Sequence, residues 1–316
     1  MLAFLCRNDF RRVKRARIRA SCDDLCLEQF FINTAKIYEA HRLSAVLGSL
    51  EDITDFEKAV NDGVKLSPPA LHIDTGMNRL GLTIDEARSY AEHRKSETSP
   101  IVFSLLMTHF IESEIQGSSI TEKQVTLFEE MRALFPNVLA SLSNSSGVFL
   151  DKKTAYDLVR PGYALYGGNP CLDQTNPMKP VIRLEAPILQ IRFAKKGTPI
   201  GYGGEITVQR DKIIATLSIG YGDGYPRGAK NTDTKTGAEC LIAGHRCKIL
   251  GRISMDLVMA DITDCPEGAV KRGDLAVMIG DDITLDEVAA KSGTIGYEIL
   301  VHLGPRFRRR VLTGKD

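Results

Sequence analysis

The chain has 316 residues, of which 43% are hydrophobic and 26% are charged, and its formal net charge is +1 at pH 7. These values are ordinary for a globular protein, and the small charge argues against general attraction to nucleic acid or anionic membranes. No apolar run reaches the roughly 18–20 residues that a membrane-spanning helix needs. A secretory signal peptide would place basic residues before the apolar start, and here they follow it. We therefore expect a cytoplasmic protein without nucleic-acid or membrane partners.

The first thirty residues fit no regular pattern. Seven basic residues lie between Arg7 and Arg19. Such a stretch can be a mitochondrial transit peptide or a nucleic-acid-binding arm. A solvated terminus without ordered structure is the interpretation that we favour for residues 1–30.

Three T-x-x-E/Q sequences predict helix starts, because the two side chains satisfy spare backbone donors reciprocally. The pairs are Thr83 with Glu86, Thr121 with Gln124, and Thr284 with Glu287. Apolar residues at helical spacing follow the second pair, so we expect a clear helix there.

Short apolar runs alternate with these helices, and each ends in polar or small residues. They span 70–73, 101–107 and 138–142. This alternation indicates parallel β-α-β units, and a (β/α)8 barrel builds its active site from the segments that follow its strands. After about residue 180 the pattern changes to short β segments, at 188–194, 212–218, 240–242, 248–253 and 275–279. We predict an α/β fold with a barrel region over 31–180 and a mostly β domain over 181–316.

The cysteines show no metal-binding pattern. There are seven of them, an odd number, and no pair has the C-x-x-C spacing of a zinc ribbon. Cys240 and Cys247 flank His245, which leaves a metal site conceivable, but we favour reduced thiols on strands. We therefore predict no bound metal.

Six short motifs occur in order along the chain. They are HIDTGMNRLG at 72–81, SNS at 143–145, VRPGYALYG at 159–167, IGYGDG at 219–224, GRISMD at 251–256 and TIGYE at 294–298. Together they resemble the pyridoxal-phosphate-dependent alanine racemases, over about residues 43–312. Each motif alone is weak, and the ordered set is specific.

The resemblance implies how the cofactor is bound. Racemisation removes a weakly acidic Cα proton, and pyridoxal phosphate is the electron sink that this step needs. Arg160 matches the arginine that faces the pyridine nitrogen; a guanidinium stays protonated, so it would moderate the sink. His109 matches a histidine near the cofactor ring. The positions that match the family's phosphate site are Asn144, Ser145, Gly162, Tyr163 and Tyr297.

The resemblance also assigns the substrate side. Tyr221 matches the tyrosine that takes the proton from L-alanine, a task for which a general base must be tuned by its neighbours. Arg79, Met255 and Asp256 match substrate-side residues. In the family the partner subunit supplies the equivalents of Tyr221 and Met255, which implies a homodimer with shared sites. The expected activity is interconversion of L- and D-alanine for peptidoglycan; serine racemases and broad-specificity relatives share these motifs.

Two positions depart from common family choices, and one family residue has no counterpart. His72 stands where a lysine is common, and Ser141 where a histidine is frequent; we expect both changes to be tolerated. The Schiff-base lysine of the first barrel strand, which is also the second base, has no match, and Lys36 has the wrong spacing and neighbours. We expect roughly three strand–helix units to be missing and about five strands to remain. A truncated, catalytically impaired cofactor-binding remnant is therefore the alternative function.

Overall fold

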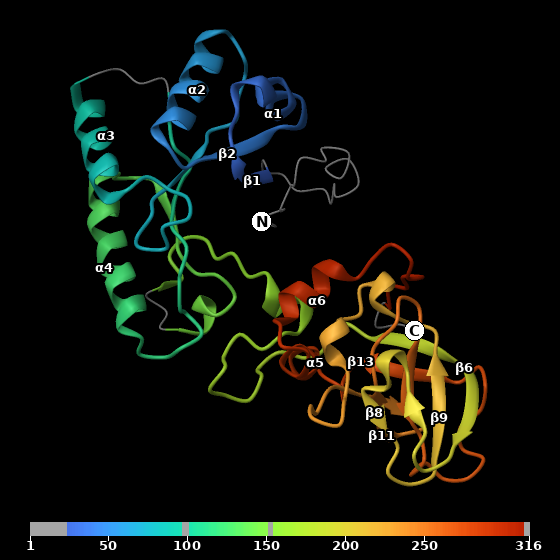
Figure 1. The fold of residues 1–316 in the computed structure, drawn as a ribbon. Helices are drawn as coiled ribbons and strands as arrows, with labels where there is room; N and C mark the ends of the chain where they lie inside the picture. The colour runs from blue at the N-terminus through green and yellow to red at the C-terminus, as the bar shows by residue number, and fades with distance from the viewer. Residues whose placement is uncertain (1–23, 97–100, 151–153, 313–316) are drawn as a thin grey trace. The chain divides into compact units, whose positions relative to one another are not determined.

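The computed structural model describes residues 24–96, 101–150 and 154–312, and it divides into two compact units. Unit 1 comprises Met1–Gly162 and Pro170–Thr175, and unit 2 comprises Tyr163–Asn169 and Asn176–Asp316. Both units are drawn in Figure 1. The first 23 residues, for which we predict a solvated terminus, lie outside the described chain.

In the described part of unit 1, five parallel strands form one sheet whose order follows the sequence. They are β1 (Asp24–Gln29), β2 (Leu43–Leu47), β3 (Ala70–His72), β4 (Leu105–Met107) and β5 (Leu139–Ser141). Consecutive parallel neighbours are the arrangement of successive units in a (β/α)8 barrel. The predicted barrel-type α/β arrangement is thus confirmed, with five strands in the described part of the unit. β1 lies inside the first thirty residues, where the sequence shows no element.

The helices of unit 1 pack against this sheet. They are α1 (Ala35–His41), α2 (Leu50–Asn61), α3 (Ile84–Ser96) and α4 (Ser119–Leu134), and α3 and α4 lie side by side (Figure 1). Their apolar faces meet the strands in a core that includes Leu47, Leu71 and Phe128. All five residues of β2 are buried, as expected for a strand covered on both faces.

Two of the three predicted helix caps form. Thr83 donates its backbone N–H to Glu86 Oε2 at 2.8 Å, and Glu86 N–H donates to Thr83 Oγ1 at 3.3 Å. Thr284 accepts from Glu287 N–H at 3.1 Å and begins α5 (Leu285–Ser292).

The predicted cap at Thr121 is wrong, although the helix itself is present. α4 begins earlier, at Ser119, and the hydroxyl of Ser118 accepts from the backbone N–H groups of Ile120 and Thr121. The physical reason is that Gln124 turns its amide into the buried side of α4, where it binds groups of the sheet instead of the helix terminus.

Unit 2 is built around a closed barrel of six antiparallel strands in the order β10-β11-β12-β9-β6-β13. Their bounds are β6 (Leu184–Ala194), β9 (Lys212–Leu217), β10 (Glu239–Ile242), β11 (His245–Leu250), β12 (Val258–Asp261) and β13 (Leu275–Ile279). Closure pairs every strand on both sides and so removes exposed sheet edges. The predicted mostly β domain is confirmed. β12 has no counterpart among the predicted β segments.

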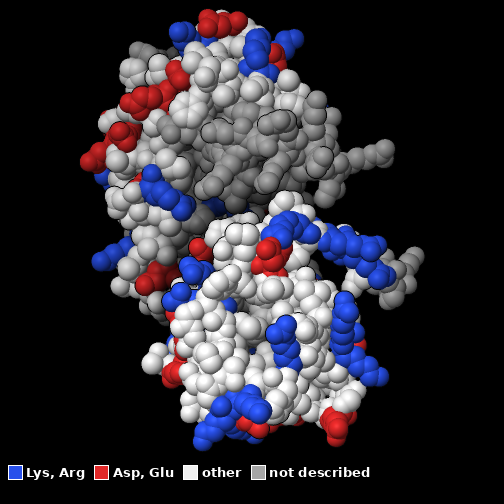
Figure 2. All heavy atoms as spheres, turned by 45° about the vertical axis from the view of Figure 1, so that its right-hand side comes forward, with Lys and Arg blue, Asp and Glu red and all other residues white. Residues whose placement is uncertain are grey.

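Smaller elements complete unit 2. β7 (Pro199–Ile200) and β8 (Ile206–Thr207) form a short hairpin, and α5 is followed by α6 (Gly296–His302). On the face shown in Figure 2, acidic and basic side chains are interspersed among uncharged ones, in keeping with the net charge of +1. Within the described ranges, no helix combines the length and apolar character needed to cross a bilayer.

Candidate active site

The predicted cofactor residues of unit 1 follow the ends of its strands. His72 is the last residue of β3, and His109 lies two residues after β4. Ser145 follows β5, and Arg160 lies on the segment after it, beyond the parallel bridge from Ser141 to Leu158. Because the carboxyl ends of parallel strands meet at one edge of a sheet, these side chains share that edge.

Arg160 is held by the ends of two strands. Its Nη1 donates to Ser141 Oγ, and its Nη2 donates to the carbonyl oxygen of Thr108 at 2.6 Å. The side chain keeps some contact with solvent, while the surrounding protein lowers the pKa of Arg160 to about 10. The guanidinium therefore stays charged at neutral pH. The serine that replaces the family's frequent histidine is thus a direct hydrogen-bond acceptor for Arg160.

Two histidines beside Arg160 are neutral at pH 7. Burial, and then repulsion by Arg160, lowers the pKa of His72 to about 4, although Asp74 opposes this shift. The pKa of His109 also falls to about 4, through burial, Arg160 and Arg79. We call Arg79 and Arg160, with the neutral His72 and His109 beside them, the cationic cluster. Positive charge from the two guanidinium groups therefore outweighs the negative charge of Asp74 at this edge. Such an edge suits anionic groups.

The loop after β5 provides hydrogen-bonding groups for a phosphate. Ser145 is buried, and its Oγ accepts from the backbone N–H of Gly162 at 2.9 Å. A side chain built on Gly162 would meet no atom within 4 Å, so space is open beside this pair. Asn144 Oδ1 accepts from Ser113 Oγ at 2.7 Å and from Gly147 N–H at 2.9 Å, which fixes the loop. A hydroxyl and an amide beside open space fit the oxygen atoms of a phosphate.

A buried polar network lies behind this edge, and the sequence motifs did not assign its residues to the site. Gln124 Nε2 donates to Thr75 Oγ1 at 3.0 Å and to the carbonyl oxygen of His109 at 2.9 Å. Its Oε1 accepts from Ile111 N–H at 2.9 Å, and the hydroxyls of Thr75 and Thr108 are 2.9 Å apart. The signal was available: Gln124 occupies the same helix face as the apolar core residues of α4. Buried polar groups need such partners, so the network ties α4 to two strand ends.

In unit 2, Tyr163 and Tyr297 form a stacked pair. Their ring centroids are 4.2 Å apart with an interplanar angle of 18°. Tyr163 donates its hydroxyl to Asp286 Oδ1 at 2.7 Å, and burial together with this carboxylate raises the pKa of Tyr163. Gly296 permits the pair, because a Cβ there would lie 1.7 Å from the Tyr163 hydroxyl oxygen. Tyr163 thus positions the ring of Tyr297.

Tyr221 and Met255 lie together on two loops of unit 2. The backbone N–H of Tyr221 donates to Ser254 O at 3.1 Å, and that of Gly222 donates to Met255 O at 2.8 Å. Both side chains are accessible, Tyr221 at 43% and Met255 at 54%. The Arg227 guanidinium lies 5.9 Å from the centre of the Tyr221 ring, a contact that the sequence did not indicate.

Asp256 is an ion-pair partner in this structure. Its carboxylate binds Arg306 Nη2 at 2.6 Å, and Arg306 Nε lies 3.2 Å from Asp223 Oδ1. Asp223 in turn accepts from the backbone N–H of Gly220 at 2.9 Å. The arginine therefore connects the loop of Met255 to the loop of Tyr221.

No lysine within the described residues lies on a strand of the parallel sheet. Lys36, which the spacing excludes, lies on α1 with an exposed side chain that pairs with Glu39 at 3.1 Å. Within the same ranges, no group of three or more potential ligands is arranged to hold a metal ion.

A parallel barrel-type sheet with arginines and neutral histidines at its strand ends, followed by a closed β barrel, defines a two-domain protein whose candidate site lies at the carboxyl ends of the sheet. The model of the alanine racemase N-terminal domain matches residues 8–170, and that of the C-terminal domain matches residues 181–311. The chain belongs to the alanine racemase family.

Curated relatives and solved structures agree with this assignment. Alanine racemase of Methylobacterium nodulans is 45% identical over 92% of this chain and 76% of its own length. The structure of alanine racemase from Bartonella henselae with covalently bound pyridoxal phosphate has a TM-score of 0.85 at 31% identity, covering 94% of this chain and 81% of that one. For biosynthetic alanine racemase from Pseudomonas aeruginosa the TM-score is 0.86 at 31% identity, with 98% and 84% covered.

Proposed function

We propose that this protein binds pyridoxal phosphate and interconverts L- and D-alanine, supplying D-alanine for peptidoglycan. The observation that carries the proposal is the cationic cluster at the strand ends of unit 1, in a chain that matches both family domains. We assign residues 31–180, together with the strand β1 (Asp24–Gln29) that pairs with them, to the barrel region, and residues 181–316 to the C-terminal domain.

When bound, pyridoxal phosphate supplies the electron sink for the charge that develops at the substrate Cα. We assign the phosphate to Ser145, the backbone N–H groups of Gly162 and Tyr163, and Tyr297, with Asn144 fixing the loop. Arg160 serves the ring nitrogen as a hydrogen-bond donor that keeps its proton, because its pKa stays near 10. His109 lies beside Arg160 as a neutral group.

The substrate side of the proposal consists of Tyr221, Arg79, Met255 and Asp256. Tyr221 is the base that removes or returns the Cα proton on one face, and Arg79 brings a positive charge to the substrate carboxylate. Asp256 acts through Arg306, which its carboxylate holds at 2.6 Å. Alanine is the expected substrate because its methyl group suits a site closed by bulky residues such as Tyr163 and Tyr297.

We further propose a homodimer in the cytoplasm. Tyr221 and Met255 are large side chains with exposures of 43% and 54%, and a second copy of the chain would cover them. Cys240, Cys247 and Cys265 are thiols in this structure, which agrees with a reducing compartment.

A second candidate function is cofactor binding without racemase turnover. It is favoured by one observation: within the described residues, no strand of the parallel sheet carries a lysine. Such a lysine would be the base on the second face of the substrate. Tyr221 alone accounts for only one of the two proton transfers.

Both candidates can be tested with the purified chain and added pyridoxal phosphate. We would measure conversion of L-alanine by chiral chromatography, and cofactor binding by absorbance before and after borohydride reduction. Racemisation that falls about 10²-fold or more in Tyr221→Phe, and is unchanged in Tyr202→Phe, supports the enzyme. Binding without turnover supports the second candidate, and neither binding nor turnover contradicts both. Peptide mapping after reduction would identify any lysine that holds the cofactor.

A further inference from the structure

Two thiols of unit 2 open into one cavity, away from the loops of Tyr221 and Met255. Cys247 lies on β11, and Cys265 lies on the segment that follows β12. Their sulfur atoms are 3.7 Å apart, and both residues line a cavity of about 260 Å³. The other lining residues are charged or ionisable: Arg210, Lys212, Glu239, His245, Arg246, Lys248, Asp261 and Asp264.

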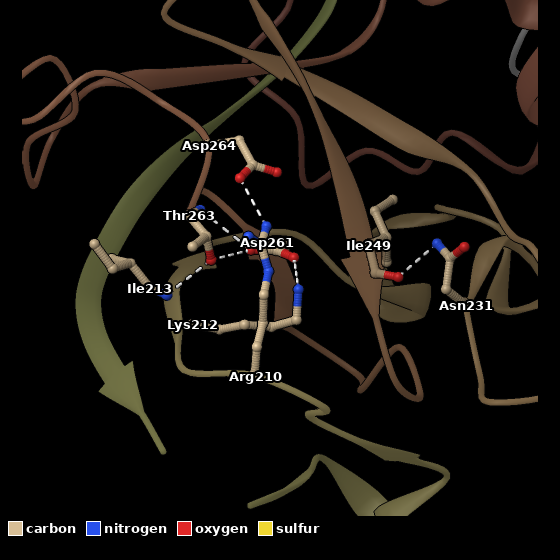
Figure 3. A network of polar contacts seen from close by, with 8 residues as sticks. All are labelled: Arg210, Lys212, Ile213, Asn231, Ile249, Asp261, Thr263 and Asp264. Carbon is tan, nitrogen blue, oxygen red and sulfur yellow. Dashed lines mark hydrogen bonds and ion pairs between the residues drawn. The ribbon is translucent and has the colours of Figure 1, made fainter. Parts of the chain in front are cut away.

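The segment that carries Cys265 is tied to the barrel by polar contacts (Figure 3). Lys212 pairs with Asp261, and Arg210 Nη2 binds Asp264 Oδ1 at 2.7 Å. Thr263 Oγ1 accepts from the backbone N–H of Ile213 at 3.0 Å. Three of the four residues before Cys265 are thus bound to β9 or to the residues just before it. These contacts fix the position of Cys265 beside Cys247.

A third thiol lies close but is placed differently. Cys240 on β10 is opposite Cys247 in the β10–β11 register, is fully buried and is not among the residues that line the cavity. Its Sγ donates to the carbonyl oxygen of Cys247 at 3.7 Å. Burial and the neighbouring thiols raise the pKa of Cys247, whereas Cys265 is partly accessible. Cys265 is therefore the thiol that an oxidant meets first.

We propose that Cys247 and Cys265 form a reversible disulfide when the protein is exposed to a hydroperoxide. The Cys265 thiolate attacks one oxygen of the peroxide, the O–O bond breaks, and a sulfenic acid and hydroxide are formed. Cys247 then attacks the Cys265 sulfur, an S–S bond forms, and the sulfenic hydroxyl leaves as water. Two thiols are oxidised by two electrons, and one hydrogen peroxide is reduced to two molecules of water.

The geometry allows this bond with small movements. An S–S bond is about 2.05 Å long, so rotation about the two Cα–Cβ bonds must close roughly 1.7 Å. The bond would join β11 to the segment after β12, and the closed ring would include β12 and the loop that carries Met255. Closing that ring restricts the unfolded chain, so the oxidised form should melt at a higher temperature.

The test uses the whole chain, first reduced and then treated with hydrogen peroxide. Remaining thiols are blocked with N-ethylmaleimide, and a non-reducing peptide map locates any bond. We expect a Cys247–Cys265 linked peptide that dithiothreitol separates, and a Tm several degrees higher by circular dichroism. Cys265→Ser should abolish both effects, and Cys171→Ser, in unit 1, should keep both.

Three results would overturn the proposal. The first is a bond from Cys247 to Cys240 in place of Cys265. The second is oxidation of Cys265 to sulfinic acid without a linked peptide, and the third is two thiols that still react fully with N-ethylmaleimide. Because the linked peptide is measured without substrate or cofactor, the outcome is independent of racemase activity.

Discussion

The two units place their functional residues on different kinds of support. In unit 1 the strands β3, β4 and β5 have three residues each, and the candidate site lies on the segments that follow them. Those segments are joined by a few main-chain hydrogen bonds, such as that from Arg160 N–H to Ser143 O, and in addition by buried side chains, above all Gln124 and Arg160. In unit 2 a closed barrel satisfies the backbone, and the loops of Tyr221 and Met255 are joined mainly by main-chain hydrogen bonds.

This difference teaches where each unit is vulnerable. Side-chain networks in a buried setting depend on the chemistry of a few groups, because a lost partner leaves another group unsatisfied. Main-chain contacts depend instead on space, because they need glycines where two backbones approach. Gly220 illustrates this, since a Cβ there would lie 2.2 Å from Met255 O. The predictions below separate these two dependences, from the largest expected effect to the smallest.

Acidification should destabilise unit 1 through its two half-buried histidines. The folded pKa values of His72 and His109 are about 4, below the unfolded value of about 6.5. The unfolded chain therefore binds protons between these values and the folded chain does not, so stability is complete above about pH 6.5 and is lost as the pH falls toward 4. We expect a combined loss of about 4–6 kcal/mol.

Hydrogen exchange with mass spectrometry suits this measurement, because the chain has no tryptophan and peptides report each unit separately. Replacing both histidines, His72→Asn with His109→Asn, should flatten the pH dependence in unit 1. The exposed His93→Asn serves as the control. An unchanged slope in the double variant would show that other groups govern the acid response.

Removing the amide of Gln124 should destabilise unit 1 by about 2–4 kcal/mol, because the Ile111 N–H and the His109 carbonyl lose their partner. Gln124→Met keeps the length of the side chain without its polar atoms. Lys123→Met, at the exposed neighbouring position, is the matched control. Urea unfolding, monitored by hydrogen exchange in α4, measures the difference in stability between the two variants. Equal stability would mean that the network has no energetic role.

A methyl group at position 296 should separate the stacked tyrosines of unit 2. Gly296→Ala places its Cβ 1.7 Å from the Tyr163 hydroxyl oxygen, so the ring must move and its bond to Asp286 is strained. We expect a loss of about 1–3 kcal/mol from this overpacking, with weaker pyridoxal-phosphate binding. Gly304→Ala is the control, because its nearest contact is an ordinary 3.4 Å. Thermal unfolding and a cofactor titration measure the two effects, and identical behaviour of both variants would contradict the packing argument.

The smallest effect concerns the start of α4. Ser118→Ala removes the hydroxyl that accepts from Ile120 and Thr121, and we expect a loss of about 1 kcal/mol. Ser119→Ala, at the first residue of the helix, should change the free energy of unfolding by about a few tenths of a kcal/mol at most. A loss in Ser119→Ala as large as in Ser118→Ala would place the helix start elsewhere.

Much of the fold could be predicted because local patterns express it. Thr83 and Thr284 cap helices as their spacing predicts, and β3 and β9 fall within the predicted apolar runs. The six ordered motifs led to the family that the comparisons show. The roles of the individual site residues stay predictions, as does the arrangement of those residues in an assembled active site.

The sequence alone therefore determined the features that appear as periodic or contiguous patterns along the chain. These are the strands, the helices, two of the three caps and the order of the motifs. Only the tertiary structure decided that Gln124 serves the sheet edge, that Ser141 is the acceptor for Arg160, and that Cys247 and Cys265 are neighbours. Each of these pairs residues from separate elements, as when Gln124 reaches Thr75 from 49 positions away. Local spacing holds no information about such contacts, because chain folding and burial set which distant groups must satisfy each other.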